Sequence, residues 1–165
     1  MDVQPAILDR LPDKDAYLAK ATALVEAARK RQIPVIYVVV GFRPGAPEAT
    51  PSQKQWAPHL TDPQPTIAPE EGDIVVVKRR VSAFSGSDLE VVLRAQNIRH
   101  LVLAGIATSG VVLSTVREAA DKDFRLTVLS DACADADAEV HSFLMSKIFP
   151  RQAEVLTGEE WAQAE

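Results

Sequence analysis

Cysteine, long apolar runs and excess positive charge are all scarce in this chain of 165 residues. The single cysteine, Cys133, excludes an internal disulfide framework and is typical of a cytosolic protein. The longest apolar runs, such as residues 35–41, are far too short to span a bilayer, and no signal-peptide pattern opens the sequence. A formal net charge of -5 argues against nucleic acid or an anionic membrane as the main partner. We therefore expect a cytoplasmic protein.

Closely spaced metal ligands are also missing from the sequence. The three histidines, His59, His100 and His141, lie far apart and show none of the short spacings by which paired histidines hold a metal ion. We expect neither a catalytic metal nor a cofactor.

Strand-like and helix-like stretches alternate along the chain. Apolar runs without polar alternation occupy residues 35–40, 74–77 and 101–104, and such runs are typical of parallel strands covered on both faces. Asp13 is placed to cap a helix whose apolar face includes Leu18. The alternation predicts one three-layer α/β/α domain over the whole chain (1–165), with a Rossmann-like, mainly parallel sheet of about six strands.

The second half of the chain continues this alternation. Ser87 or Asp88 is expected to cap one helix, and Thr157 is expected to cap the last one. Strands are expected over residues 126–129, ending at Ser130, and over residues 153–156.

A proline-rich excursion interrupts the pattern at residues 42–69, which hold seven of the 11 prolines. Regular structure must be short there, so one interpretation is a rigid surface excursion. Long excursions in compact domains are often functional. The other interpretation is therefore a lid or a subunit contact that carries Phe42, Arg43, Trp56 and His59 over a pocket.

The most informative stretch is a predicted strand–turn–helix joint around Gly105 and Gly110. Such a joint directs backbone N–H groups and the positive end of a helix dipole at a crevice, where many hydrolases place a nucleophile. The first helical residue is predicted to be Val111, which supports neither acid–base nor nucleophilic chemistry. Ser109 and Ser114 have no His or Lys tied to them by spacing, so neither is expected to replace a nucleophile.

Ligands bind at the carboxyl ends of the strands in such a sheet, and three candidate residues stand there. Asp2 follows what looks like the end of a strand, Lys78 ends the second apolar run, and Val111 begins the helix. Asp2 also fits a frayed terminal carboxylate, and Lys78 with Arg79 and Arg80 also fits a solvated charged face. The strand-end positions favour a pocket role for both.

Four segments along the chain form a recognisable ordered set. They are Asp2-Val3-Gln4; Val77-Lys78-Arg79-Arg80 with Ser82-Ala83-Phe84; Gly105-Ile106-Ala107-Thr108 through Thr115; and Ser130-Asp131-Ala132-Cys133-Ala134-Asp135 with His141. Each segment alone is weak evidence for a family, but the ordered set is specific and covers nearly the whole chain. With it the chain resembles the isochorismatase-like hydrolase family, also called the cysteine hydrolases.

The resemblance implies an active site, a fold and an assembly. It places a catalytic triad on Asp2, Lys78 and position 111, where Asp acts as general base, Lys supports the charge and Cys forms a covalent acyl intermediate. It also implies a six-stranded parallel sheet, a small-molecule substrate and a homodimer or larger homo-oligomer.

Further site residues follow from the same resemblance. A cis peptide is expected between Ile106 and Ala107, in a turn that reaches Gly110 and Val111 and shapes the oxyanion hole. Substrate contacts are expected from the aromatic and basic side chains near the site. These are Phe42, Arg43, Trp56 and Phe84.

The chain departs from the family pattern in three places. Position 111 is Val, and removing a nucleophile from a hydrolase can cost on the order of 10⁶ in kcat, so thiol chemistry is not expected. Gly41-Phe42-Arg43 stands where the nicotinamidase branch carries a metal-binding Asp-x-His. Family members also have an apolar strand directly before the residue matching Asp2, so we expect a truncated first strand with unpaired neighbours.

Two functions remain open at this point. The first is a hydrolase that works without cysteine, through Asp2 and Lys78, on a vinyl ether or a C–N bond. Isochorismatases proper also lack the Cys and use the Asp as an acid on a vinyl ether. The alternative is a catalytically inactive member that serves as a small-molecule binding or oligomeric scaffold protein.

Overall fold

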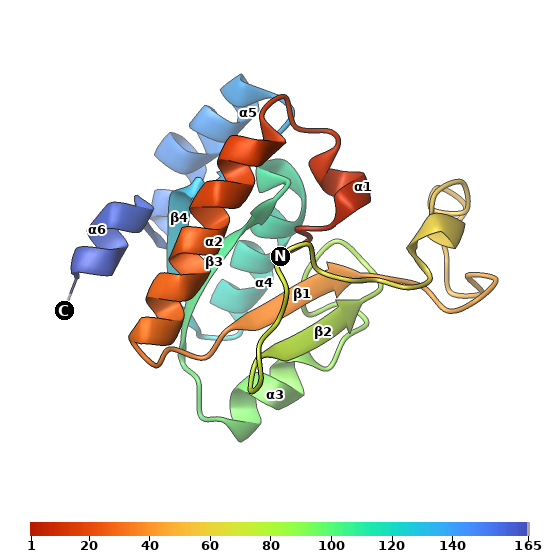
Figure 1. Cartoon of the computed structure of the whole chain (residues 1–165), viewed down its shortest axis with the longest axis horizontal. Helices are drawn as coiled ribbons and strands as arrows, with labels where there is room; N and C mark the ends of the chain where they lie inside the picture. Colours follow the sequence, from red (N-terminus) through yellow and green to blue (C-terminus); the bar gives the residue numbers. More distant parts are fainter. Residues whose placement is uncertain (165) are drawn as a thin grey trace.

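Five parallel strands form the framework of the protein in a computed structural model, which describes residues 1–164 (Figure 1). They form two sheets. The first pairs β1 (Ile36–Val40) with β2 (Ile74–Lys78), and the second has the order β3 (His100–Ile106), β4 (Arg125–Ala134), β5 (Glu154–Leu156). The predicted α/β class with parallel strands is confirmed; the described residues hold five strands in two sheets, where about six with a truncated first strand were expected. Met1 and Asp2 lie between β1 and β3 and hydrogen-bond to both.

Helices cover both faces of these strands. They are α1 (Pro5–Leu8), α2 (Lys14–Lys30), α3 (Leu89–Ala95), α4 (Leu113–Asp121), α5 (Ala138–Phe143) and α6 (Gly158–Gln163). Short π-helical turns precede α4 (Thr108–Val112) and follow α5 (Leu144–Ile148), and 3₁₀ turns occupy Ala57–Leu60 and Phe149–Arg151. Figure 1 shows α2 on one face of the second sheet and α4 on the other.

Helix starts follow the capping residues of the sequence. The Asp13 carboxylate accepts a hydrogen bond from Ala16 N–H at 3.1 Å, as predicted. Thr157 and Glu160 form a capping box at the start of α6. Before α3 it is Ser87 whose hydroxyl accepts from Leu89 N–H, while the Asp88 side chain makes no capping bond.

The main core lies between the strands and the face covered by α3 and α4. The buried side chains that build it include Val38, Val76, Leu103, Val116 and Val128. Among them Val38, Val76 and Leu103 come from apolar runs without polar alternation, which is the pattern of strands buried on both faces. None of the helices described within residues 1–164 is long and apolar enough to cross a membrane.

Two predicted boundaries are wrong. β4 was expected to end at Ser130, but it continues to Ala134 after a register shift against β3, and Cys133 pairs with Gly105. Helical structure after β3 begins with the π turn at Thr108, three residues before Val111. In both places the element extends beyond the boundary that the local sequence pattern predicts. The added residues include side chains that are buried inside the protein.

Candidate active site

Asp2, which precedes α1 and hydrogen-bonds to β1, meets Lys78 at the carboxyl end of β2. The Lys78 Nζ atom lies 2.9 Å from Asp2 Oδ2, and the two side chains are only 3% and 8% exposed. Lys78 is the last residue of β2, and its Nζ also donates to Arg80 C=O at 2.9 Å. The pair is therefore a buried, hydrogen-bonded ion pair and not part of a solvated face.

The backbone around Asp2 fixes this carboxylate between the two sheets. Asp2 N–H donates to Val38 C=O of β1 at 2.7 Å, and Ile106 N–H of β3 donates to Met1 C=O at 3.2 Å. The Gln4 side-chain amide pairs with the last residue of β1. It accepts a hydrogen bond from Val40 N–H and donates one to Val40 C=O. Asp2 itself has a positive φ of 57°, which turns the chain away from the strand direction.

Burial dominates the electrostatics of Asp2. Asp2 Oδ1 is buried and has no hydrogen-bond partner among residues 1–164. Desolvation raises the pKa of the Asp2 carboxyl above its ordinary value, and the attraction and hydrogen bond of Lys78 oppose this only in part. A carboxyl that holds a proton more tightly than usual, with one oxygen unengaged, is suited to act as an acid.

The raised pKa predicts how stability depends on pH. A carboxyl with a higher pKa in the folded state stabilises the fold fully below its unfolded pKa of roughly 4, and this contribution is lost as pH rises through the folded pKa. The buried Met1 amine acts in the opposite direction, because desolvation lowers its pKa. We expect the free energy of unfolding of the wild type to fall, relative to that of Asp2→Asn, from about pH 4 upwards.

Urea denaturation of both proteins across this pH range checks the expectation. The Asp2 carboxylate raises the pKa of the Met1 amine, so the amine's contribution differs between the two proteins, and the comparison is repeated with the amine acetylated in both. A difference that stays flat, or that grows in favour of the wild type with rising pH, would contradict a raised pKa at Asp2.

The joint after β3 has the predicted strand–turn–helix order. The peptide bond between Ile106 and Ala107 is cis. Gly105 is required just before it, because a Cβ there would lie 2.4 Å from Met1 C=O. Val111 lies in the following turn and is 2% exposed, packed in the same apolar cluster as Phe84. Position 111, where the resemblance places the nucleophile, thus holds a buried hydrocarbon side chain.

Two polar contacts at this joint do not follow from the sequence spacing. His141 Nδ1 lies 2.8 Å from Thr108 Oγ1, which ties α5 to the turn. The Ser109 hydroxyl donates to Asp135 Oδ2 at 2.6 Å, and Ser109 N–H donates to the same oxygen at 2.8 Å. Ser109 is therefore held by a carboxylate. The only available signal was that Asp135 and His141 belong to the recognised fourth segment.

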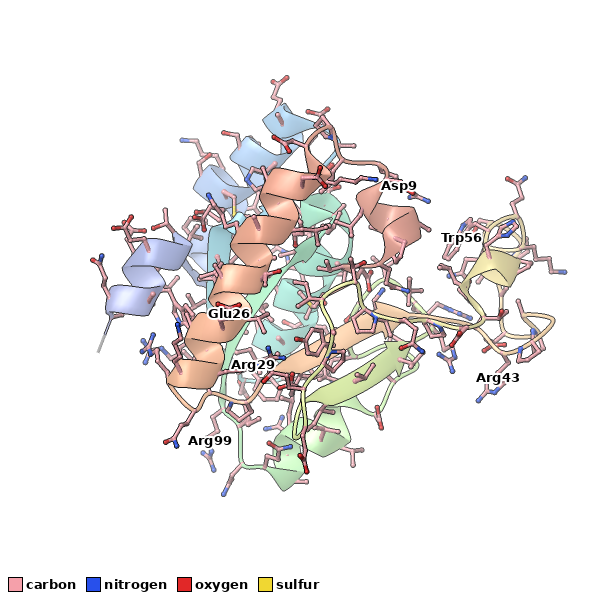
Figure 2. All side chains as sticks on the ribbon, in the orientation of Figure 1. Asp9, Glu26, Arg29, Arg43, Trp56 and Arg99 are labelled. Atoms are coloured by element: carbon pink, nitrogen blue, oxygen red, sulfur yellow. The ribbon has the colours of Figure 1, made fainter. Side chains whose placement is uncertain are left out.

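Three of the predicted substrate contacts lie on the excursion, away from the buried ion pair. Figure 2 shows Arg43 and Trp56 on the part of the excursion that projects from the sheets. Phe42 is 3% exposed and packs edge-on against Trp56, with ring centroids 5.5 Å apart. Arg43 pairs with Glu48, which also receives Arg79 at 3.1 Å. Only Phe84, among the four, lies in the cluster that contains Val111.

Cys133 and possible metal ligands were also considered within the part of the chain that the structure describes. Burial raises the pKa of the Cys133 thiol to about 12, so this thiol stays protonated. No group of three or more His, Cys, Asp or Glu side chains within residues 1–164 is arranged to hold a metal ion.

Comparison with known proteins agrees with this geometry. The model of the isochorismatase domain matches residues 1–160. The uncharacterized isochorismatase family protein YecD of Escherichia coli is 35% identical over 153 residues, which are 88% of this chain and 81% of that protein. Ureidoacrylate amidohydrolase RutB of Caulobacter segnis is 45% identical over 85 residues, covering 52% of this chain and 34% of that protein.

Solved structures of the same family also resemble this chain. An isochorismatase family protein from Burkholderia thailandensis has a TM-score of 0.85 and 33% identity, covering 98% of this chain and 91% of that one. The chain belongs to the isochorismatase family of hydrolases.

Proposed function

We propose that this family member hydrolyses a small molecule without a thiol nucleophile, through Asp2 as acid and Lys78 as its electrostatic partner. One observation carries the proposal: the carboxylate and ammonium groups are 2.9 Å apart, both buried, and Asp2 Oδ1 is unengaged among residues 1–164. Burial raises the pKa of the Asp2 carboxyl above its ordinary value, in the direction that suits a proton donor.

A vinyl ether fits this acid better than an amide does. Asp2 would donate its proton to the vinyl ether, and Lys78 would stabilise the carboxylate left behind. Water then completes the hydrolysis, so no covalent acyl intermediate is needed. Some relatives are named as C–N hydrolases, such as ureidoacrylate amidohydrolase and N-carbamoylsarcosine amidase. In this chain Val111 removes the thiol route to that reaction.

The alternative is a family member that binds a small molecule without converting it. The observation in its favour is Val111, whose side chain is 2% exposed and fills the nucleophile position. In that case the excursion at residues 42–69 would serve as a lid or as a contact in a homo-oligomer.

A substrate panel separates the two functions. We expect hydrolysis of isochorismate or a related vinyl ether, and a fall of about 10²- to 10⁴-fold in kcat in Asp2→Ala, the range for a general acid. Lys78→Ala should also lose most of the activity. Product formation is followed by chromatography.

A surface ion pair provides the control for this panel. Asp9 and Lys14 are 2.8 Å apart but half-exposed or more, so Asp9→Ala should leave turnover unchanged. Activity that survives Asp2→Ala would refute the proposed acid. A compound that raises the melting temperature of the wild type but is never converted would favour the binding protein instead.

A further inference from the structure

The excursion at residues 42–69 is tied to the chain that directly follows Lys78. β1 and β2 end side by side, and Gly41 N–H donates to Lys78 C=O at 3.1 Å. The excursion leaves the protein where β1 ends (Figure 1). The Arg79 guanidinium donates to Gly41 C=O at 2.9 Å. The residues after Lys78 therefore bond to the base of the excursion.

One glutamate of the excursion accepts several of these contacts. Glu48 Oε1 accepts hydrogen bonds from Arg43, through the backbone N–H at 3.0 Å and the guanidinium at 3.3 Å. The same oxygen lies 3.1 Å from Arg79 Nε. Desolvation alone would raise the pKa of the Glu48 carboxyl, but hydrogen bonds from backbone N–H groups and the charges of Arg43 and Arg79 lower it. Glu48 is therefore an anion that holds two arginines.

The backbone of Glu48 binds a third arginine. The Arg80 guanidinium donates to Glu48 C=O at 3.0 Å and to Arg79 C=O at 2.8 Å. A guanidinium can bridge two carbonyls because its N–H donors have a fixed planar geometry. The side chain and the backbone of one residue thus hold both Arg79 and Arg80.

The carbonyl of Arg80 in turn contacts the candidate active site. Lys78 Nζ donates to Arg80 C=O at 2.9 Å and lies at the same distance from Asp2 Oδ2. The Lys78 side chain is 3% exposed, so these two acceptors, and not bulk water, fix the position of its ammonium. A displacement of the Arg80 carbonyl would release one of them.

We propose that Glu48 is a positioning residue for Lys78. By holding Arg79 with its carboxylate and Arg80 with its carbonyl, Glu48 fixes the Arg80 C=O group that orients the Lys78 ammonium. A small misplacement of a catalytic group can cost about 100-fold in rate, even when the change lies far from the reacting atoms. The consequence for turnover rests on the function proposed above, whereas the position of Lys78 can be measured without a substrate.

Two variants test the proposal, and each breaks one link. Glu48→Ala removes the carboxylate, and Arg80→Met removes the contact with Glu48 C=O at an exposed position, where the fold should tolerate it. A less firmly held Lys78 lowers the pKa of the Asp2 carboxyl less, so the titration of Asp2 should move to higher pH in both variants. The Met1 amine, the other charged group that acts on Asp2, is kept in both.

The titration is followed by ¹³C NMR of the side-chain carboxyl groups, and Asp2→Asn identifies the Asp2 signal. Glu90→Ala is the matched control, because the Glu90 carboxylate also pairs with two cations, Arg94 and Lys122, but on α3. It should leave the Asp2 titration unchanged.

Turnover gives a second readout. Glu48→Ala should lower kcat by about 10- to 100-fold and leave KM nearly unchanged, because Lys78 acts on the reacting groups and not on substrate binding. Combining Glu48→Ala with Arg80→Met should lose little more than the stronger single variant, since both act through the same carbonyl.

Two outcomes would overturn the proposal. The first is an unchanged Asp2 titration in folded Glu48→Ala and Arg80→Met proteins. The second is an equal shift in Glu90→Ala, which would mean that any lost surface charge pair moves the titration. If the titration shifts as expected but none of the proteins converts a substrate, the positioning role stands and the proposed function fails.

Discussion

Replacing Val111 with Cys is expected to create thiol-dependent amide hydrolysis in this protein. The position lies in the turn that leads into α4, where backbone N–H groups and the helix dipole stabilise a thiolate and an oxyanion. In its ionised form, held 2.9 Å from Lys78 Nζ, the Asp2 carboxylate would act as the base in this variant, and Lys78 would provide the supporting charge. We expect a rate at least about 100-fold above that of Val111→Ala, a small part of the roughly 10⁶ that a native nucleophile contributes.

The native cysteine makes this experiment easy to read. Burial raises the pKa of the Cys133 thiol to about 12, and the wild type and Val111→Ala keep this cysteine, so both should lack thiol-dependent amidase activity. Amidase assays of the three proteins measure the gain. Adding Asp2→Asn to Val111→Cys should remove it. A folded Val111→Cys protein without the gain, or a gain that survives Asp2→Asn, would contradict the proposed arrangement of the site.

Part of the site was predictable because parallel strands end at the same edge. Asp2 and Lys78 are 76 positions apart in the chain, yet Lys78 ends an apolar run and the Asp2 segment looks like the end of a strand. Strand ends in an α/β sheet converge on one crevice. The same logic placed the joint at Gly105. Strand ends and tight turns are determined by short segments, so they can be predicted from the sequence.

The remaining features depend on tertiary contacts that no local pattern encodes. Proline content predicted an irregular excursion, but the packing of Phe42 against Trp56 is set by how the excursion folds back on itself. Glu48 engages Arg43 and Arg79, so Arg43, which was expected to face a substrate, is already paired. The division into two sheets likewise depends on which strands become neighbours, and apolar runs do not specify this.

Removing the Lys78 ammonium is expected to destabilise the protein strongly. Lys78→Met keeps the length of the side chain but leaves Asp2 buried without its partner, and breaking a buried ion pair costs about 3–5 kcal/mol in the free energy of unfolding. Asp2 then takes up a proton more readily, because Lys78 no longer lowers the pKa of its carboxyl. The loss of stability should therefore be smaller at acid pH than at neutral pH.

A double-mutant cycle separates the pair from the packing around it. Adding Asp2→Asn to Lys78→Met removes the uncompensated charge and should recover about half or more of the loss, which gives a coupling free energy of roughly 2 kcal/mol or more. Urea unfolding of the four proteins measures it. Lys14→Met, which breaks the exposed pair with Asp9 at the same kind of distance, serves as the control and should change stability little. Additive effects of Asp2→Asn and Lys78→Met would mean that the two groups do not stabilise each other. That result would contradict the proposal that Lys78 is the electrostatic partner of Asp2.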